Sequence, residues 1–142
     1  MSTKISLADV TVIFGNAPER QALPLMRKGE TKADILARTG HVVAASEVSF
    51  EVAEGEIFVI MGLSGSGKST LIRCINRLIE PTTGEIQIDG EDILSADKNR
   101  LRAIRWTKMA MVFQHFALFA HKSVSDNVSY GLKAKGVSKQ ER

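Results

Sequence analysis

The decapeptide MGLSGSGKST constrains this chain more than any other part of its sequence. It holds Gly62, Gly65 and Gly67 in front of Lys68, and it follows directly on the apolar run Ile57-Phe58-Val59-Ile60. Glycine loses more backbone entropy on folding than any other residue, so three glycines this close together need a physical reason. The sequence therefore indicates that something approaches the main chain closely at this point.

The residues on either side of the glycines predict a strand before the loop and a helix after it. Ile57 to Met61 is continuously apolar, which is typical of a short strand covered on both faces in the centre of an α/β sheet. After the loop, apolar residues recur at the spacing of an amphipathic helix that ends before Pro81. These helical positions i, i+3, i+4 and i+7 are Leu71, Cys74, Ile75 and Leu78.

This setting matches that of a phosphate-binding loop. Gly62 through Ser69 fit the pattern Gly-x-x-x-x-Gly-Lys-Ser/Thr, in which bare backbone amides and a helix N-terminus converge on phosphate oxygens. We expect Lys68 to reach the β- and γ-phosphates, Ser69 to bind Mg²⁺ and Thr70 to donate toward the α-phosphate. The alternative is a tight strand-to-helix turn with a chance lysine. The motif alone does not separate ATPases from GTPases and kinases.

The other segments continue an α/β pattern. Alternating or β-branched residues predict further strands, and Thr31 and Ser123, each followed by Asp three residues later, open predicted helices as capping boxes. Residues 16–30 contain Pro18, Pro24 and Gly29, so we expect a connector there. The predicted strands are 5–14, 41–52, 86–88 and 109–113, with a hairpin turn after 86–88, and the predicted helices are 31–38, 96–105 and 123–132.

Composition excludes several classes of protein. Of 142 residues, 44% are hydrophobic and 25% charged, which is typical of a globular domain, and the net charge of +3 gives only a weak preference for anionic partners. The single cysteine excludes an internal disulfide, no secretory signal follows Met1, and no run approaches the roughly 18 apolar residues of a membrane span. We expect a protein of the reducing cytosol whose membrane association comes through a partner.

Two longer stretches carry a resemblance to a known family. GEIFVIMGLSGSGKSTLIRCINRLIEPTTGEIQIDGEDI resembles the opening of an ATP-binding cassette (ABC) domain, and MVFQHFALFAHKSVSDNV resembles the glutamine loop of that family. ALPLMRKGETKADILARTGHVVAASEVSF is similar to an amino-terminal insertion in ATPase subunits of importers for glycine betaine, proline betaine and choline.

The similarity covers essentially the whole chain and implies its organisation. Residues 1–142 resemble the amino-terminal part of an ABC ATPase domain, an α/β P-loop NTPase core truncated within its helical subdomain. Within it, 16–40 resemble the insertion, 57–80 the strand, phosphate loop and helix, and 109–135 the glutamine loop and the start of the helical subdomain.

The resemblance also implies roles for single residues. Gln114 is similar to the family glutamine that contacts Mg²⁺ and the attacking water, so Lys68 and Gln114 are the expected catalytic residues, and Ser69 and Gln114 the expected metal ligands. Phe14 corresponds to the aromatic residue that stacks on adenine, with a plain core Phe as the alternative. The expected nucleotide-binding residues are Phe14, Gly62, Leu63, Ser64, Gly65, Ser66, Gly67, Lys68, Ser69 and Thr70.

The implied function is that of the ATP-binding subunit of a quaternary-amine importer, using ATP and Mg²⁺ at the cytoplasmic face of the inner membrane. Its implied partners are a transmembrane permease, a second ATPase subunit in a homodimer and, indirectly, a substrate-binding protein. The family's Leu-Ser-Gly-Gly-Gln signature, Asp-Glu pair and switch histidine are absent from these 142 residues, so we expect this chain alone to bind ATP without hydrolysing it. A non-catalytic nucleotide-binding module is the second hypothesis, and a P-loop kinase the third.

Three further features have plainer interpretations. His115 and His121 are six residues apart without a nearby cysteine or carboxylate cluster, so we expect loop packing or partner contact in place of a metal site. Cys74 lies on the apolar helix face and is expected to be an inert core thiol. The basic residues of segment 96–108 predict a solvated helix face in place of a nucleic-acid-binding patch. They are Lys98, Arg100, Arg102, Arg105 and Lys108, with Trp106 among them.

Overall fold

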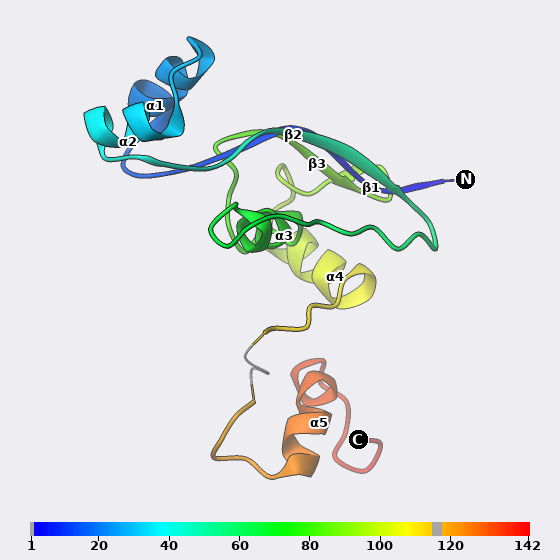
Figure 1. Ribbon diagram of the computed structural model, residues 1–142. Coiled ribbons are helices and arrows are strands. Elements are labelled where there is room, and N and C mark those ends of the chain that lie inside the picture. The colour runs from blue at the N-terminus through cyan, green and yellow to red at the C-terminus, as the bar shows by residue number, and fades with distance from the viewer. Residues whose placement is uncertain (1, 115–117) are drawn as a thin grey trace. The chain divides into compact units, whose positions relative to one another are not determined.

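Four strands form one antiparallel sheet in the order β2-β1-β3-β4. The computed structural model describes residues 2–114 and 118–142 and divides into two units, Met1–Met109 and Ala110–Arg142. The sheet belongs to the first unit, and its long strands β1 and β2 pair over most of their lengths (Figure 1). The strands are β1 (Thr3–Phe14), β2 (Val42–Ala53), β3 (Thr83–Ile88) and β4 (Glu91–Asp92).

Two helices of the first unit cover one face of this sheet. Helix α3 (Lys68–Ile75) and helix α4 (Lys98–Lys108) contribute Leu71, Cys74 and Ile104 to a core with strand residues such as Val10 and Ile86. All five side chains are buried, and burial raises the pKa of the Cys74 thiol to about 11. The expectation of a core thiol is confirmed by this burial, and a thiol that stays protonated is expected to be a poor nucleophile.

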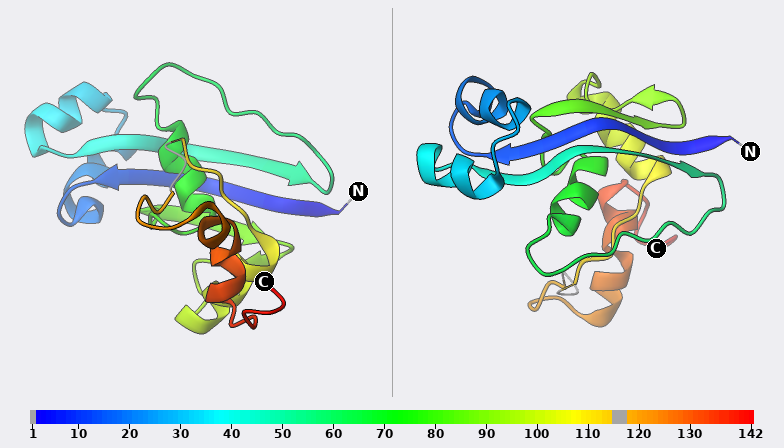
Figure 2. Two further views of the ribbon diagram at one scale, coloured as in Figure 1. Left: turned by 90° about the horizontal axis from the view of Figure 1, so that it is seen from below. Right: turned by 45° about the horizontal axis from the view of Figure 1, so that its top comes forward.

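A second, smaller core lies at the end of β1 and β2, where two helices form a separate projection (Figures 1 and 2). Helix α1 (Pro18–Arg27) and helix α2 (Lys32–Thr39) bury Leu23 and Ile35 against Ile13 and Val43 of the strands. Thr31 accepts a hydrogen bond from the Asp34 amide, as the predicted cap requires, and Gly40 ends α2 in the left-handed conformation. We call residues 16–40, which include both helices, the helical insertion.

The prediction of a connector over 16–30 is wrong, because α1 occupies most of it. Pro18 lies in the first turn of α1, where its missing amide is not needed. Pro24 lies inside the helix and removes only one possible hydrogen bond, and burial of Ala22 and Leu23 offsets that loss. The two prolines are therefore compatible with a helix at their positions in this segment.

Helix α3 is shorter than predicted, since it ends at Ile75 and not beyond Leu78. Arg77 has the left-handed φ of 53°, and its guanidinium donates to the carbonyl oxygens of Ile93 and Ala96. Arg105 of α4 donates to the carbonyl oxygens of Asn76 and Arg77 at 2.9 and 2.8 Å. Arg105 thus occupies the Asn76 and Arg77 carbonyl oxygens, which would accept backbone amides if the helix continued.

The two predicted apolar strands at 57–61 and 109–113 are absent, and both predictions are corrected. Residues 57–61 follow β2 without a strand partner among the described residues, and Ile57 is 90% exposed. Phe58 stacks on Phe50 of β2, with ring centroids 4.5 Å apart. Val112 is 94% exposed. An apolar run becomes a buried strand only where neighbouring strands supply hydrogen bonds on both edges, and the described sheet offers none to these segments.

The second unit contains one helix, α5 (Val124–Ala134), among its described residues. The Ser123 hydroxyl accepts a hydrogen bond from the Asp126 amide, so the second predicted capping box is confirmed in its position. Asn127 accepts from the Phe119 amide at 2.8 Å and donates to the Ser123 carbonyl oxygen at 3.0 Å. One amide side chain therefore holds the segment before the helix against its first turn.

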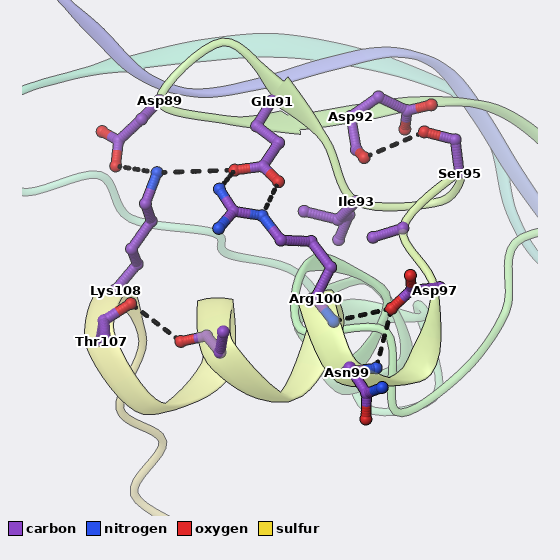
Figure 3. Close-up of polar contacts among 12 residues, drawn as sticks. Asp89, Glu91, Asp92, Ile93, Ser95, Asp97, Asn99, Arg100, Thr107 and Lys108 are labelled. Carbon is purple, nitrogen blue, oxygen red and sulfur yellow. Dashed lines mark hydrogen bonds and ion pairs between the residues drawn. The ribbon is translucent and has the colours of Figure 1, made fainter.

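A charged cluster joins the β3–β4 hairpin to α4 (Figure 3). Arg100 donates two hydrogen bonds to Glu91, and the Lys108 ammonium lies 3.0 Å from Asp89. Lys4 of β1 reaches the same Asp89 carboxylate at 2.7 Å. Hydrogen bonding from Arg100 is the main cause that lowers the pKa of Glu91, and hydrogen bonding from Lys4 and then Lys108 lowers that of Asp89. The basic residues of α4 thus serve in part as ion-pair partners within the fold.

We expect Glu91→Gln to lower the melting temperature at pH 7 and to have no effect in acid. A carboxyl whose pKa is lowered in the folded state from its usual 4.5 stabilises above that value, and the contribution is lost as the pH falls through the folded pKa. Thermal unfolding between pH 7 and about pH 3 measures this. Glu85→Gln on β3, an exposed carboxylate without an ion pair among the described residues, is the control. A difference that persists unchanged in acid would show that Glu91 acts by packing and not by charge.

Candidate phosphate-binding site

The glycine-rich loop lies between the mostly exposed segment 57–61, of which Ile60 alone packs against the core, and the first turn of α3. Gly65 and Gly67 have φ of 79° and 91°, a left-handed conformation that residues with a Cβ adopt only under strain. The Ser66 amide donates to the Leu63 carbonyl oxygen at 3.2 Å, so the chain turns back on itself before α3 begins. Two of the glycines are therefore required by the path of the backbone.

Gly67 is required for a second reason, which is its distance from β2. A Cβ on Gly67 would lie 2.1 Å from the carbonyl oxygen of Ala44, closer than any non-bonded contact allows. Glycine lets the residue that caps the N-terminus of α3 rest directly on the strand backbone. The loop is thereby fixed to the sheet at one known position along β2.

The N-terminus of α3 offers amides to a ligand. The first hydrogen bond within the helix runs from the Leu71 amide to the Gly67 carbonyl oxygen at 2.9 Å, so the amides of Lys68, Ser69 and Thr70 precede the helical ladder. Gly67 has no side chain that could cap them. These amides and the positive end of the helix dipole favour an anion at this point.

Lys68 brings a full positive charge into the same loop. Its ammonium donates to the carbonyl oxygens of Gly62 and Leu63 at 2.7 and 2.6 Å, and to the Ser66 hydroxyl at 3.3 Å. A Cβ on Gly62 would lie 2.7 Å from that hydroxyl oxygen, so the first glycine of the motif leaves room for Ser66 beside the ammonium. The lysine is held by the loop and not extended into solvent.

The predicted phosphate-loop residues therefore lie together. They form one continuous loop and the first turn of α3, which together contain main-chain amides, one ammonium and four hydroxyls. They are Gly62, Leu63, Ser64, Gly65, Ser66, Gly67, Lys68, Ser69 and Thr70. This donor set fits a polyphosphate, and the Ser69 hydroxyl fits a Mg²⁺ ion accompanying it.

Phe14 lies near this loop along the sheet. It ends β1 and pairs with Val42, which stands two residues before Ala44 on β2. Two residues of a strand span about 7 Å, so the Phe14–Val42 pair is about that distance along β2 from the residue that contacts Gly67. Phe14 is 44% exposed, and its exposure favours a surface contact over the alternative of a plain core residue.

The remaining predicted site residues lie in the second unit. Gln114 is exposed and follows residues 110–113, which form neither helix nor strand, and its role toward Mg²⁺ stays a prediction. His115 lies outside the described residues. His121 contacts the edge of the Phe119 ring, and no three His, Cys, Asp or Glu side chains within 2–114 and 118–142 are grouped as a metal site.

Sequence reasoning missed His41, which is buried with 3% of its surface exposed. Its ring contacts backbone carbonyl oxygens of residues on both sides of the helical insertion. The sequence gives little sign of this role, because one partner is Asn16, twenty-five positions away. The positions of Gly15 and Gly40 at the two ends of the insertion are the only local hint.

An exposed apolar surface marks the second unit. Leu118, Val124 and Val128 are at least 70% exposed, and with Phe119 and Asn127 they line a shallow apolar depression beside α5. No helix among the described residues is long and apolar enough to span a bilayer. Contiguous exposed apolar surface in a protein is typical of a contact with another molecule.

Comparison with known proteins gives a consistent picture. A family model described as ABC transporter matches residues 45–142. The glycine betaine transport ATP-binding protein OpuAA of Bacillus subtilis is 52% identical over 139 residues, which are 98% of this chain and 33% of that protein. The glycine betaine/proline betaine transport system ATP-binding protein ProV of Salmonella typhimurium is 48% identical over 142 residues, which are 100% of this chain and 35% of that protein. The chain thus spans about a third of the length of these relatives.

Solved structures of the ATP-binding cassette MJ0796 resemble the fold. A dimeric structure has a TM-score of 0.74 and 31% sequence identity, and covers 96% of this chain and 51% of the other. A second structure is described as a dimeric post-hydrolysis state bound to ADP and Pi, with a TM-score of 0.73 and 30% identity over the same shares of the two chains. The α/β phosphate-loop fold expected from the sequence is confirmed.

We expect Gly67→Ala to lower the free energy of unfolding by about 3 kcal/mol, because it adds a collision with the Ala44 carbonyl to the strain of a left-handed φ. Gly65→Ala is the matched control: its φ is also left-handed, but a Cβ there meets nothing within 4 Å, so we expect a loss of about 1 kcal/mol. Chemical denaturation of both variants measures the difference. Equal losses would mean that the approach of Gly67 to β2 does not constrain the loop.

Proposed function

Because this chain belongs to the ABC transporter family, we propose that it forms the ATP-binding part of a membrane importer that takes up a quaternary amine. The proposal covers glycine betaine, proline betaine and choline as substrates. It draws on the sequence of the helical insertion and on the transport systems named for its relatives OpuAA and ProV. Hydrolysis of ATP in the complete transporter would drive the uptake.

One observation carries the nucleotide-binding part of the proposal. The first amides of α3 and the Lys68 ammonium belong to one continuous loop and helical turn, and Gly67 fixes the start of that turn against β2. A triphosphate needs this combination of several main-chain donors with one cation at short range. A cassette of similar fold is described as bound to ADP and Pi, which supports the same ligand class for this chain.

Different residues of the loop would contact different parts of the nucleotide. Lys68 would exchange its contacts with the Gly62 and Leu63 carbonyl oxygens for the β- and γ-phosphates. The Ser69 hydroxyl would be a Mg²⁺ ligand, and Thr70 would donate toward the α-phosphate. Mg²⁺, when bound, neutralises charge that develops on the phosphates during transfer. Phe14 would stack on the base.

Gln114 would act in hydrolysis and not in the basic affinity for nucleotide. Its amide would orient the attacking water and contribute a second ligand to Mg²⁺. Turnover also needs a group that is not identified among these residues, since phosphoryl transfer requires further charge stabilisation around the γ-phosphate. Binding is therefore the step on which the described residues can be tested directly.

We propose as partners a second copy of the ATPase subunit, a transmembrane permease and, indirectly, a substrate-binding protein, with the chain at the cytoplasmic face of the membrane. The dimeric state described for MJ0796 supports the first partner. The exposed apolar residues Leu118, Val124 and Val128 support a protein contact on the second unit. The absence of a membrane-spanning helix from the described residues is compatible with peripheral attachment.

We expect Lys68→Ala to weaken binding of Mg·ATP by about a hundredfold, because the charged ammonium that would donate to the phosphates is lost. Isothermal titration measures the affinity, and thermal unfolding without nucleotide verifies that the variant folds. Lys98→Ala removes the same charge from an exposed position on α4 and should leave the affinity unchanged. Equal affinities of Lys68→Ala and the unaltered chain would reject the proposed site.

A further inference from the structure

His41 lies where the helical insertion joins the sheet. It follows Gly40 at the end of α2 and precedes β2, and its side chain is buried. Figures 1 and 2 show that the insertion projects from this end of the long strands, so the chain leaves the sheet and returns to it at one place. A buried imidazole is costly unless both of its nitrogens find polar partners.

Both nitrogens of His41 face backbone carbonyl oxygens, on opposite sides of the insertion; the neutral ring donates to one of the two oxygens, and the imidazolium donates to both. Nε2 lies 3.0 Å from the Asn16 carbonyl oxygen on the departing segment, and Nδ1 lies 3.0 Å from the Thr39 carbonyl oxygen on the returning segment. The His41 amide also donates to the Thr39 hydroxyl at 3.3 Å. The ring therefore bridges two segments that are far apart in sequence.

Gly15 holds the ring from the other side. A Cβ on Gly15 would lie 2.2 Å from Cδ2 of His41 and 2.7 Å from Nε2, so the imidazole occupies the space that any other side chain at this position would take. The backbone of Gly15 is thus in direct contact with the ring, and Asn16 is hydrogen-bonded to it. Two consecutive residues after Phe14 are fixed by one side chain.

We infer that His41 is a positioning residue for the nucleotide base. It fixes Gly15 and Asn16 and thereby sets the direction in which Phe14, the preceding residue, presents its ring. The inference rests on the proposed function, in which Phe14 stacks on the base of a nucleoside triphosphate held at the glycine-rich loop. His41 itself touches neither the base nor the phosphates.

The hydrophobic core of the insertion holds the two helices, whereas the His41 ring contacts Gly15 and Asn16. Ala22, Leu23 and Ile35 pack on Ile13 and Val43, which are strand residues before Phe14 and after Val42. That cluster anchors the two helices to the sheet through apolar side chains, which Gly15 and Asn16 do not have. Loss of the His41 contacts should therefore loosen the segment after Phe14 while α1 and α2 stay folded.

The test compares two ligands, Mg·ATP and Mg·tripolyphosphate, which share phosphates and differ in the nucleoside. We expect the unaltered chain to bind Mg·ATP more tightly than Mg·tripolyphosphate. Phe14→Ala should lower the ratio of the two affinities about tenfold, in line with base stacking on aromatic side chains. His41→Leu, of similar volume but without nitrogens, should weaken ATP about fivefold and leave tripolyphosphate unchanged. In the Phe14→Ala background, His41→Leu should have no further effect on ATP.

Two additional variants guard against a merely structural effect. Gly15→Ala displaces the ring from the opposite side and should reproduce the loss of ATP preference. Ile35→Val removes buried volume from the core of the insertion and should leave the ratio of the two affinities unchanged. This control matters because it perturbs α2 without touching the His41 contacts.

Each contrary result has a distinct meaning. If His41→Leu weakens both ligands equally, or weakens neither while Phe14→Ala weakens ATP, the positioning role is wrong and the proposed nucleotide site stands. If the effects of Phe14→Ala and His41→Leu simply add, His41 does not act through Phe14, and the inference also fails. If the unaltered chain binds neither ligand, the proposed function fails and this inference fails with it.

Discussion

The contact between Gly67 and the backbone of Ala44 is the constraint on which the rest of this structure depends. It brings the N-terminus of α3 onto β2 with no side chain between them. The helix therefore directs its first amides at a position fixed relative to the sheet, while its apolar face, with Leu71 and Cys74, enters the core. One missing Cβ thus couples the folding of the unit to the placement of its anion-binding groups.

The interactions of Lys68 determine how such a site gains affinity. In this structure its ammonium already makes two hydrogen bonds to loop carbonyl oxygens and one to Ser66. A phosphate that binds here replaces these bonds and does not simply add new ones. The free energy of binding is therefore a difference between two satisfied states, and a more rigid loop would not automatically bind more tightly.

The sequence predicted best what is decided locally. The glycine spacing before Lys68 and the caps at Thr31 and Ser123 each depend on residues within one or two turns, and the structure has them where they were expected. The prediction of a strand at 57–61 is wrong because an apolar composition indicates a preference for burial but does not identify the neighbouring strands that would bury the segment. His41 could not be found, since its role arises only when Asn16 returns to it in the fold.

The pairing of Phe14 with Val42 has a further consequence for the design of this chain. Since β1 and β2 already pair at Phe14 and Val42, the register of the sheet does not depend on the length of the helical insertion between them. The entropic cost of closing the connection there changes only slowly with its length. The junction is thus a natural point for grafting a foreign module or an exogenous reporter. A graft that keeps Gly15, Asn16 and His41 would retain the contacts of the His41 ring that join the two ends of the insertion. A graft that replaces them would need another contact between the two ends.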